Sequence, residues 1–222
     1  DVLNDCTAEV AMLLMLGAAH RAHEGEHIVR HGDWSQWGPT FLLGTELRAK
    51  RLGILGMGRI GQRVAHLARA FGMAIHYSNQ KRLPPEREAG ATFHADSDDL
   101  LRQSDYLSIH APLTPDTRHW LDARRIGLLP KGAIVVNSAR GPIIDDGALI
   151  AALKSGQVAA AGLDVFEGEP LNVNRGYFDL PNAFLLPHLG SASLETRTAM
   201  GMRAVDNLDA FFAGKKPGDR LV

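Results

Sequence analysis

The sequence predicts a doubly wound α/β fold, in which helices cover both faces of a parallel sheet. Two patterns indicate it: short apolar runs alternate with amphipathic segments, and a glycine-rich turn follows the first run. The chain has 222 residues, of which 45% are hydrophobic and 22% charged, which is enough for one large domain with its own core. We divide it into a leading helix (1–22), an arm (23–45), the α/β core (46–190) and a C-terminal helix and tail (191–222).

The leading helix is expected from residue 7 to about residue 21. Apolar residues recur there at helical spacing, namely Val10, Leu13, Leu14 and Gly17. Asn4, Asp5 and Thr7 are the candidate N-caps, because their side chains accept hydrogen bonds from the free N–H groups of a helix start. The apolar stretch 10–19 is about half of the roughly 20 residues that span a bilayer, so it predicts a buried helix and no membrane association.

The arm is expected to be extended over residues 25–43. This stretch has no periodicity, several glycines and a proline, and two tryptophans, Trp34 and Trp37. A segment of this kind commonly packs on a partner, so we expect a homodimer in which the arm of one copy lies on the other.

The α/β core is expected to contain six strands and four crossover helices. The apolar runs that predict buried parallel strands are 52–55, 74–77, 106–110, 133–137, 160–165 and 183–186. The amphipathic segments between them are 60–71, 97–103, 122–129 and 145–155, and a last one at 193–212 predicts the C-terminal helix. In such a sheet, ligands bind at the carboxyl ends of the strands.

Charge and cysteine content narrow the class of ligand. The 24 Lys and Arg nearly cancel the 25 Asp and Glu, so the chain has no overall basic field for nucleic acid, and a small-molecule ligand is expected instead. The single cysteine, Cys6, excludes an internal disulfide and a CxxC metal site, which fits a reducing compartment and predicts a cytoplasmic protein.

The glycine-rich turn predicts a dinucleotide site. It reads Gly56-Met57-Gly58-Arg59-Ile60-Gly61 and lies between a predicted strand and a predicted helix. The first glycine permits a tight turn, the second lets a pyrophosphate approach the backbone, and the third lets the helix pack on the strand, while the helix start offers free N–H groups. The sequence therefore predicts a Rossmann-type dinucleotide-binding domain with cofactor contacts at Gly56, Gly58, Arg59, Ile60 and Gly61. The alternative is an ordinary βα turn.

The residues after the second strand bear on the choice of cofactor. They are Ser78, Asn79, Gln80, Lys81 and Arg82, with no carboxylate among them. An NAD site usually has Asp or Glu about 20 residues past the glycines, whereas an NADP site has neutral donors and a cation. We therefore expect NADP(H) to be preferred over NAD(H), with Ser78, Asn79, Lys81 and Arg82 as contacts. The alternative is a solvated surface turn.

Four further motifs resemble the D-2-hydroxyacid dehydrogenase family, and with the glycine turn they cover essentially the whole chain. They are His110-Ala111-Pro112-Leu113-Thr114-Pro115-Asp116-Thr117, Val136-Asn137-Ser138-Ala139-Arg140-Gly141, Gly162-Leu163-Asp164-Val165-Phe166-Glu167-Gly168-Glu169-Pro170 and Leu186-Pro187-His188-Leu189-Gly190. The resemblance implies that Arg140, Glu169 and His188 are the catalytic set.

The chemistry of a 2-oxo acid reduction suits these three residue types. His188 supplies a proton near neutral pH, the Glu169 carboxylate orients it, and the planar fork of Arg140 suits a substrate carboxylate. Each has a structural alternative: a capping or surface arginine, a turn glutamate and a satisfied histidine at a strand end. We favour catalysis because all three follow consecutive strands of one sheet.

The resemblance also assigns further residues. It implies that His110, Ala111 and Pro112 flank the adenine side, that Thr117 approaches the cofactor, and that Ser138, Ala139, Asp164 and Gly190 line the nicotinamide end. It implies a preceding substrate domain, which this chain lacks.

The arm is similar to that of glyoxylate/hydroxypyruvate reductases in the motif Gly32-Asp33-Trp34-Ser35-Gln36-Trp37. By this resemblance Trp37 reaches the neighbouring subunit's active site. The expected function is NADPH-dependent reduction of a small 2-oxo acid such as glyoxylate or hydroxypyruvate. The alternatives are a dehydrogenase for another D-2-hydroxy acid and a non-catalytic NAD(P)H sensor of the corepressor type.

A cluster of histidines suggests either a metal site or a solvated helix end. His20, His23, His27 and His31 have helix-like spacing, but Gly25 interrupts them and hydride transfer needs no metal. We expect a solvated helix end and no metal.

Overall fold

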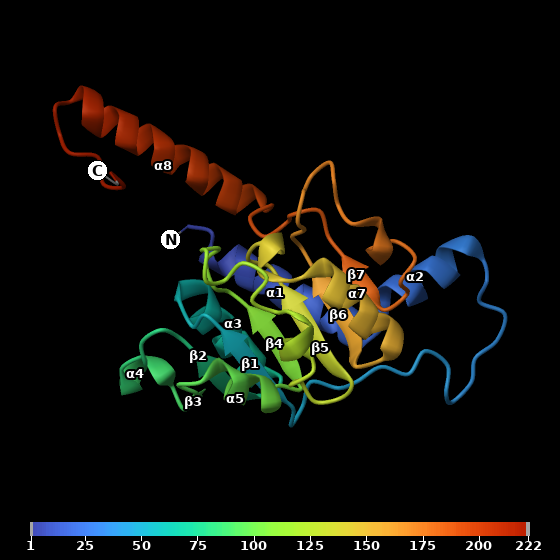
Figure 1. The fold of residues 1–222 in the computed structure, drawn as a ribbon. Coiled ribbons are helices and arrows are strands. Elements are labelled where there is room, and N and C mark those ends of the chain that lie inside the picture. The colour runs from blue at the N-terminus through green and yellow to red at the C-terminus, as the bar shows by residue number, and fades with distance from the viewer. Residues whose placement is uncertain (1, 221–222) are drawn as a thin grey trace.

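The structure, a computed structural model that describes residues 2–220, is built on a seven-stranded sheet in which every neighbouring pair is parallel (Figure 1). The strand order is β3-β2-β1-β4-β5-β6-β7. The strands are β1 (Arg51–Leu55), β2 (Ala74–Ser78), β3 (Thr92–Phe93), β4 (Tyr106–Ile109), β5 (Ala133–Asn137), β6 (Val158–Leu163) and β7 (Ala183–Leu185). This confirms the predicted doubly wound fold. The two-residue strand β3 was not predicted, because two residues show no periodicity.

Helices cover both faces of this sheet. One face carries α1 (Asn4–Ala19) and α3 (Arg59–Ala70), and the other carries α5 (Ser97–Arg102), α6 (Ala123–Ile126) and α7 (Asp146–Ser155). Two apolar cores result, one on each side, and the central strands β4 and β5 are buried along their whole length. The shorter elements are α4 (Pro85–Glu88) and two 3₁₀ turns, Gly141–Ile143 and Arg175–Tyr177.

Side-chain caps fix where several helices begin. Asp96, Asp122, Asp145 and Ser193 each accept a hydrogen bond from a backbone N–H in the first turn of α5, α6, α7 and α8 (Leu194–Phe212), respectively. These helices start within one residue of the predicted starts, because the capping residue can be recognised in the sequence.

The first helix starts earlier than predicted. It begins at Asn4 rather than at Thr7, and no side chain caps it. Thr7 lies inside the helix, where its hydroxyl lies 2.7 Å from the carbonyl oxygen of Gly190. Thr7, one of the candidate N-caps, therefore makes a tertiary contact instead. Burial of apolar side chains rather than a cap positions this helix.

The arm is helical in its first part. Helix α2 (Ala22–His31) occupies residues expected to be extended, and only the stretch after Gly32 is irregular. Gly25 sits inside α2 without breaking it, and ion pairs at helical spacing, Arg21 with Glu24 and Arg30 with Glu26, support it. None of its residues is buried.

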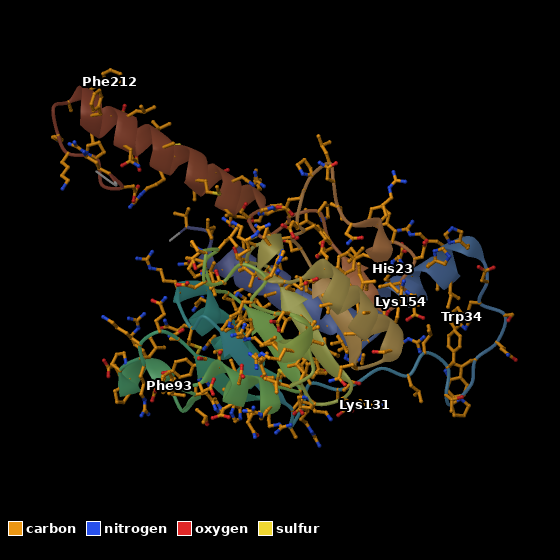
Figure 2. All side chains as sticks on the ribbon, in the orientation of Figure 1. His23, Trp34, Phe93, Lys131, Lys154 and Phe212 are labelled. Atoms are coloured by element: carbon orange, nitrogen blue, oxygen red, sulfur yellow. The ribbon has the colours of Figure 1, made fainter. Side chains whose placement is uncertain are left out.

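Two segments extend away from the sheet, as Figure 1 shows: the arm and α8. Trp34 and Phe212, labelled in Figure 2, mark their opposite ends. The most exposed apolar side chains of α8 are those of Leu194, Met202, Val205, Leu208, Phe211 and Phe212. Within residues 2–220, no helix is long and apolar enough to cross a membrane.

Candidate active site

The glycine turn lies at the point where the strand order reverses. Strands β1 and β4 are neighbours although β2 and β3 come between them in sequence, and a crevice opens at such a switch point. Gly56 follows β1 with φ of 91°, and a Cβ there would lie 2.6 Å from the backbone nitrogen of Ala111, which follows β4. Only glycine permits both this backbone conformation and this close approach.

The other two glycines behave as a dinucleotide turn requires. A Cβ at Gly61 would lie 2.4 Å from the carbonyl oxygen of Gly56, so the missing side chain lets α3 pack against the turn. A Cβ at Gly58 would meet nothing within 4 Å, and no side chain caps the start of α3 within the described residues. Open space therefore faces uncapped N–H groups, which suits a pyrophosphate.

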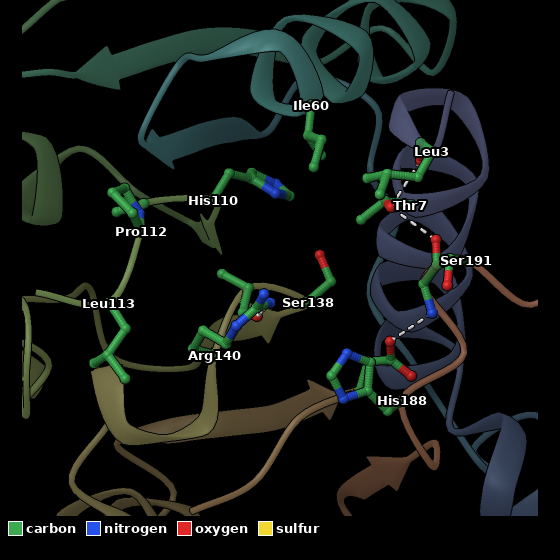
Figure 3. Close-up of a pocket in the computed structure, with 14 residues that line it drawn as sticks. Leu3, Thr7, Ile60, His110, Pro112, Leu113, Ser138, Arg140, His188 and Ser191 are labelled. Atoms are coloured by element: carbon green, nitrogen blue, oxygen red, sulfur yellow. Dashed lines mark hydrogen bonds between the residues drawn. The ribbon is translucent and has the colours of Figure 1, made fainter. Parts of the chain in front are cut away.

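A cavity of about 630 Å³ lies next to this turn (Figure 3). Figure 3 shows Leu3, just before α1, and Thr7 of α1 on one side of it and Pro112 and Leu113 on the other. The predicted site residues that line it are Ile60, His110, Ala111, Pro112, Ser138, Ala139, Arg140, Asp164, His188 and Gly190. The lining residues that sequence reasoning missed are Leu3, Thr7, Leu113 and Ser191. Leu3 and Thr7 come from the start of α1 and the residue before it, and the packing of this helix across the strand ends leaves no local signal.

Ser138 supplies an independent test of whether this cavity suits a polar ligand. The residue is 8% exposed, and within residues 2–220 its buried Oγ has no hydrogen-bond partner. A buried hydroxyl left unpaired costs about 1–3 kcal/mol, so a partner is expected from a bound molecule. The residues present therefore fit a dinucleotide that places a hydrogen-bonding group at this point of the cavity.

His110 is a neutral group in the cavity wall. Burial lowers the pKa of its imidazole to about 4, and its Nε2 lies 2.8 Å from the hydroxyl oxygen of the buried Ser108. The ring is therefore uncharged at neutral pH and is held in one orientation from the strand β4.

His188 and Glu169 form a directly bonded pair. The Nδ1 atom of His188 lies 2.6 Å from Oε1 of Glu169, and Oε2 of Glu169 accepts a hydrogen bond of 2.8 Å from the backbone N–H of Phe166. The carboxylate is thus anchored to its own loop and fixes the ring. Among the described residues Nε2 of His188 has no partner, so this nitrogen is the one left for a substrate.

Asp164 holds the turn that carries His188. Its fully buried carboxylate accepts hydrogen bonds from the backbone N–H groups of Leu189, at 2.6 Å, and Gly190, at 2.8 Å. Its carbonyl oxygen accepts from the N–H of His188, whose φ of 57° is left-handed. Burial raises the pKa of Asp164. The aspartate therefore lines the cavity and also sets the backbone position of His188.

Arg140 reaches the cavity from the turn after β5. The side chain of Asn137, at the buried end of β5, accepts from the N–H of Ala139 and donates to the carbonyl of Arg140, both at 3.0 Å. Nη1 of Arg140 lies 2.6 Å from the carbonyl oxygen of Ala139. Sequence reasoning gave Asn137 no role; a polar side chain at the end of an otherwise apolar strand was the available signal.

The segment after β2 differs in detail from the expectation. Ser78 is the buried last residue of β2, and the side-chain oxygen of Asn79 accepts a 2.6 Å hydrogen bond from the N–H of Met57, which ties the segment to the glycine turn. Lys81 is exposed. Arg82 is not a free cation, because its guanidinium forms an ion pair with Glu88, a residue that sequence reasoning missed.

Thr117 and Trp37 are among the predicted site residues that do not line the cavity. The hydroxyl of Thr117 lies 2.7 Å from the carbonyl oxygen of Pro112 and accepts from the N–H of Thr114, so Thr117 shapes the loop after β4. Trp37 is 78% exposed on the arm, which Figure 1 shows on the far side of the molecule from α8.

The histidine cluster lies on the surface. His23, His27 and His31 follow one face of the exposed helix α2, and the rings of His27 and His31 stack at 4.0 Å between centroids. Within residues 2–220, no group of three His, Cys, Asp or Glu residues is placed to hold a metal ion.

Comparisons with known proteins identify the family of this chain. The family model described as D-isomer specific 2-hydroxyacid dehydrogenase, NAD binding domain, matches residues 12–190. The chain is 51% identical to a glyoxylate reductase from Aeropyrum pernix over 97% of its own length, and 50% identical to a glycerate dehydrogenase from Hyphomicrobium methylovorum over 94%. It spans 66% and 65% of the length of these two relatives.

A solved structure shares both fold and sequence. It is the NADPH-dependent glyoxylate/hydroxypyruvate reductase from Sinorhizobium meliloti in complex with NADP and malonate, with a TM-score of 0.88 and 36% identity. The match covers 96% of this chain and 65% of that one. Together with the glycine turn and the paired His188 and Glu169, these matches show that the chain belongs to the D-isomer specific 2-hydroxyacid dehydrogenase family, of which it carries the NAD-binding domain.

Proposed function

We propose that the full-length protein reduces a small 2-oxo acid, such as glyoxylate or hydroxypyruvate, to the 2-hydroxy acid with NADPH. The observation that carries this proposal is that His188, bonded to Glu169, lines the same cavity as Arg140, beside the glycine turn. A proton donor and a cation then flank the same space, which is what reduction of a carbonyl next to a carboxylate requires.

The residues of this chain would bind the substrate carboxylate and move the proton. A nicotinamide cofactor held at the glycine turn would supply the hydride to the carbonyl carbon. Arg140 binds the substrate carboxylate and polarises the carbonyl, and Nε2 of His188 gives its proton to the carbonyl oxygen, which becomes the hydroxyl. The carboxylate of Glu169, hydrogen-bonded to Nδ1 of His188, orients the ring and stabilises its positive charge before the proton leaves.

The preference for NADPH is supported by the segment after β2. Residues 78–82 contain no carboxylate, and Lys81 and Arg82 are exposed there. A ribose 2′-phosphate would meet cations instead of a repelling carboxylate.

The arm supports a further proposal, that two copies form a dimer. Trp34 and Trp37 expose more than half of their side chains in an irregular segment with no core of its own. We propose that they pack on a second copy, with Trp37 next to that copy's active site.

The test measures oxidation of NADPH and NADH by the full-length protein with glyoxylate, hydroxypyruvate, pyruvate and phenylpyruvate. We expect turnover with NADPH, and His188→Gln lowers kcat by about 10²- to 10⁴-fold, the range for loss of a positioned acid. Cofactor affinity should change little, because the ring serves the substrate. His66→Gln, which changes an exposed histidine of α3, is the matched control.

Two results would contradict the proposal. A near-normal kcat in His188→Gln removes this residue from the mechanism. Tight binding of NADPH without turnover of any 2-oxo acid favours a sensor over an enzyme.

A further inference from the structure

A buried carboxylate lies behind the segment that follows β2. Glu88 is 7% exposed and lies at the end of α4, which Figure 1 shows beside β2 and β3 at one edge of the sheet. Its Oε1 accepts hydrogen bonds from the hydroxyl of Tyr77, at 2.6 Å, and from Nε of Arg82, at 2.8 Å. Its Oε2 accepts from Nη2 of Arg82 at 3.1 Å. Both carboxylate oxygens therefore accept hydrogen bonds, and Glu88 binds Arg82 along one edge of its guanidinium.

The same network fixes the backbone of the segment. The hydroxyl of the fully buried Tyr77 accepts a hydrogen bond of 3.0 Å from the N–H of Leu83, at the far end of the segment. Asn79 ties the near end to the glycine turn through Met57. Residues 79–83 are thus anchored at both ends, so the orientation of Arg82 is set by the protein before any ligand arrives.

The two cations of the segment are held differently. The side chain of Arg82 is 64% exposed although its Nε and Nη2 edge faces Glu88, so its outer edge, with Nη1, faces solvent. Lys81 is exposed and has no hydrogen bond or ion pair within residues 2–220. A free lysine attracts a phosphate without direction, whereas a clamped guanidinium offers N–H groups in a fixed plane.

Two effects of Glu88 on a phosphate oppose one another. Its charge repels the phosphate and partly cancels the charge of Arg82, while its hydrogen bonds remove the side-chain disorder that Arg82 would otherwise lose on binding. The hydrogen bonds from Arg82 and from Tyr77 hold the pKa of Glu88 below its usual value, so the carboxylate is ionised at neutral pH. The outer edge of Arg82 lies between Glu88 and solvent. We therefore expect the gain from orienting Arg82 to exceed the repulsion between Glu88 and the phosphate.

We propose that Glu88 is a positioning residue for cofactor choice, which orients Arg82 so that its outer edge binds the 2′-phosphate of NADPH. The proposal rests on the NADPH preference proposed above. It adds a residue that is not in the glycine turn, not in the segment 78–82 and not in the catalytic set.

The first experiment measures the dissociation constants of NADPH and NADH by calorimetry for the full-length protein and for Glu88→Gln. The glutamine keeps one oxygen for Tyr77 and Nε of Arg82 but turns an N–H group toward Nη2. We expect NADPH to bind about 5- to 20-fold more weakly, a part of the strength of one charge-assisted contact, and NADH to bind within twofold of the wild type. Glu86→Gln, an exposed neighbour on α4 with the same charge change, should leave both unchanged.

A second background makes the sign of the effect decisive. In an Arg82→Ala protein Glu88 has no guanidinium to orient and only its repulsion remains. Adding Glu88→Gln there should leave NADPH affinity unchanged or raise it. A further loss of NADPH affinity in this background would overturn the proposal.

A surface variant keeps the test independent of folding at the buried site. Arg82→Lys retains the positive charge but has no planar edge to be clamped, and it should lose NADPH affinity about 5- to 20-fold despite equal charge. Wild-type affinity in Arg82→Lys would show that charge alone attracts the phosphate, and Glu88 would then have no positioning role.

The outcomes separate this inference from the cofactor preference itself. If the wild-type protein binds NADH as tightly as NADPH, the preference fails and the role of Glu88 fails with it. If the wild type prefers NADPH and Glu88→Gln leaves the ratio of the two constants unchanged, or weakens both cofactors equally, only the role of Glu88 is refuted.

Discussion

At Gly141 the segment that carries Arg140 packs directly against the segment that carries Glu169. A Cβ at this position would lie 1.9 Å from the carbonyl carbon of Phe166 and 2.3 Å from the backbone nitrogen of Glu167. Because both atoms belong to the backbone, no side chain can be accommodated without moving one segment. The missing side chain therefore sets the spacing between Arg140 and the loop that orients His188.

Gly141→Ala tests this spacing. We expect the added methyl group to lower the free energy of unfolding by about 1–3 kcal/mol, as overpacking does, and to lower kcat by about 100-fold through a shift of about 1 Å in the catalytic groups. Denaturant unfolding and steady-state kinetics of the full-length protein measure the two effects. Gly201→Ala, in α8 where a Cβ meets nothing within 4 Å, is the control. Wild-type stability together with wild-type kcat would show that the backbone at Gly141 yields easily.

Single residues differ in how far the sequence predicts them. The fingerprint glycines can be predicted because each meets a local backbone requirement. Three glycines at fixed spacing together form a recognisable motif. Glu88 and Asn137 are not legible in this way. Glu88 bonds to residues 6 and 11 positions away, which the fold brings together by placing α4 beside β2. Asn137 acts through a turn whose shape is clear only in the folded structure.

The arm shows where prediction of elements reaches its limit. Strands and crossover helices follow apolar periodicity and capping residues, and both are properties of a short stretch of sequence. Helix α2 has no buried residue, and Gly25 suggests a break that does not occur. Beyond it, Trp34, Trp37 and Leu43 expose more than half of their side chains. Apolar side chains gathered on one exposed segment mark an interaction surface.

Sedimentation of the full-length protein tests the proposed dimer. We expect a dimer at tens of micromolar, and replacing both tryptophans, Trp34→Ala with Trp37→Ala, should weaken association by at least about tenfold because buried aromatic anchors dominate interfaces. Phe71→Ala, an exposed aromatic residue at the end of α3, is the control and should leave the dimer intact. A wild-type protein that remains monomeric would refute the role of the arm.

At the scale of the whole molecule, stability is linked to the cavity through His110. Burial lowers the pKa of this imidazole from 6.5 to about 4. The unfolded chain takes up a proton here once the pH falls below about 6.5, while the folded chain does not until about pH 4. The free energy of unfolding therefore decreases as the pH drops through this window, by at most about 3 kcal/mol from this residue.

Urea unfolding at a series of pH values measures the effect. The difference in unfolding free energy between the wild type and His110→Gln should be constant above about pH 7 and should change by up to about 3 kcal/mol between pH 6.5 and 4, because glutamine does not titrate. His66→Gln is the control, as it changes an exposed histidine. A difference that stays constant down to pH 4 would mean that His110 titrates equally in both states.

The switch point between β1 and β4 divides the sheet into two halves with separate duties. The half of β1, β2 and β3 carries the glycine turn and the segment held by Glu88, while Arg140, Glu169 and His188 follow β5, β6 and β7. Under the proposed function the two halves can diverge independently: substitutions over residues 78–88 can alter which dinucleotide is accepted while Arg140, Glu169 and His188 keep their positions. An evolving lineage, or an engineer, can exchange the source of reducing power in one half without disturbing the reaction carried by the other.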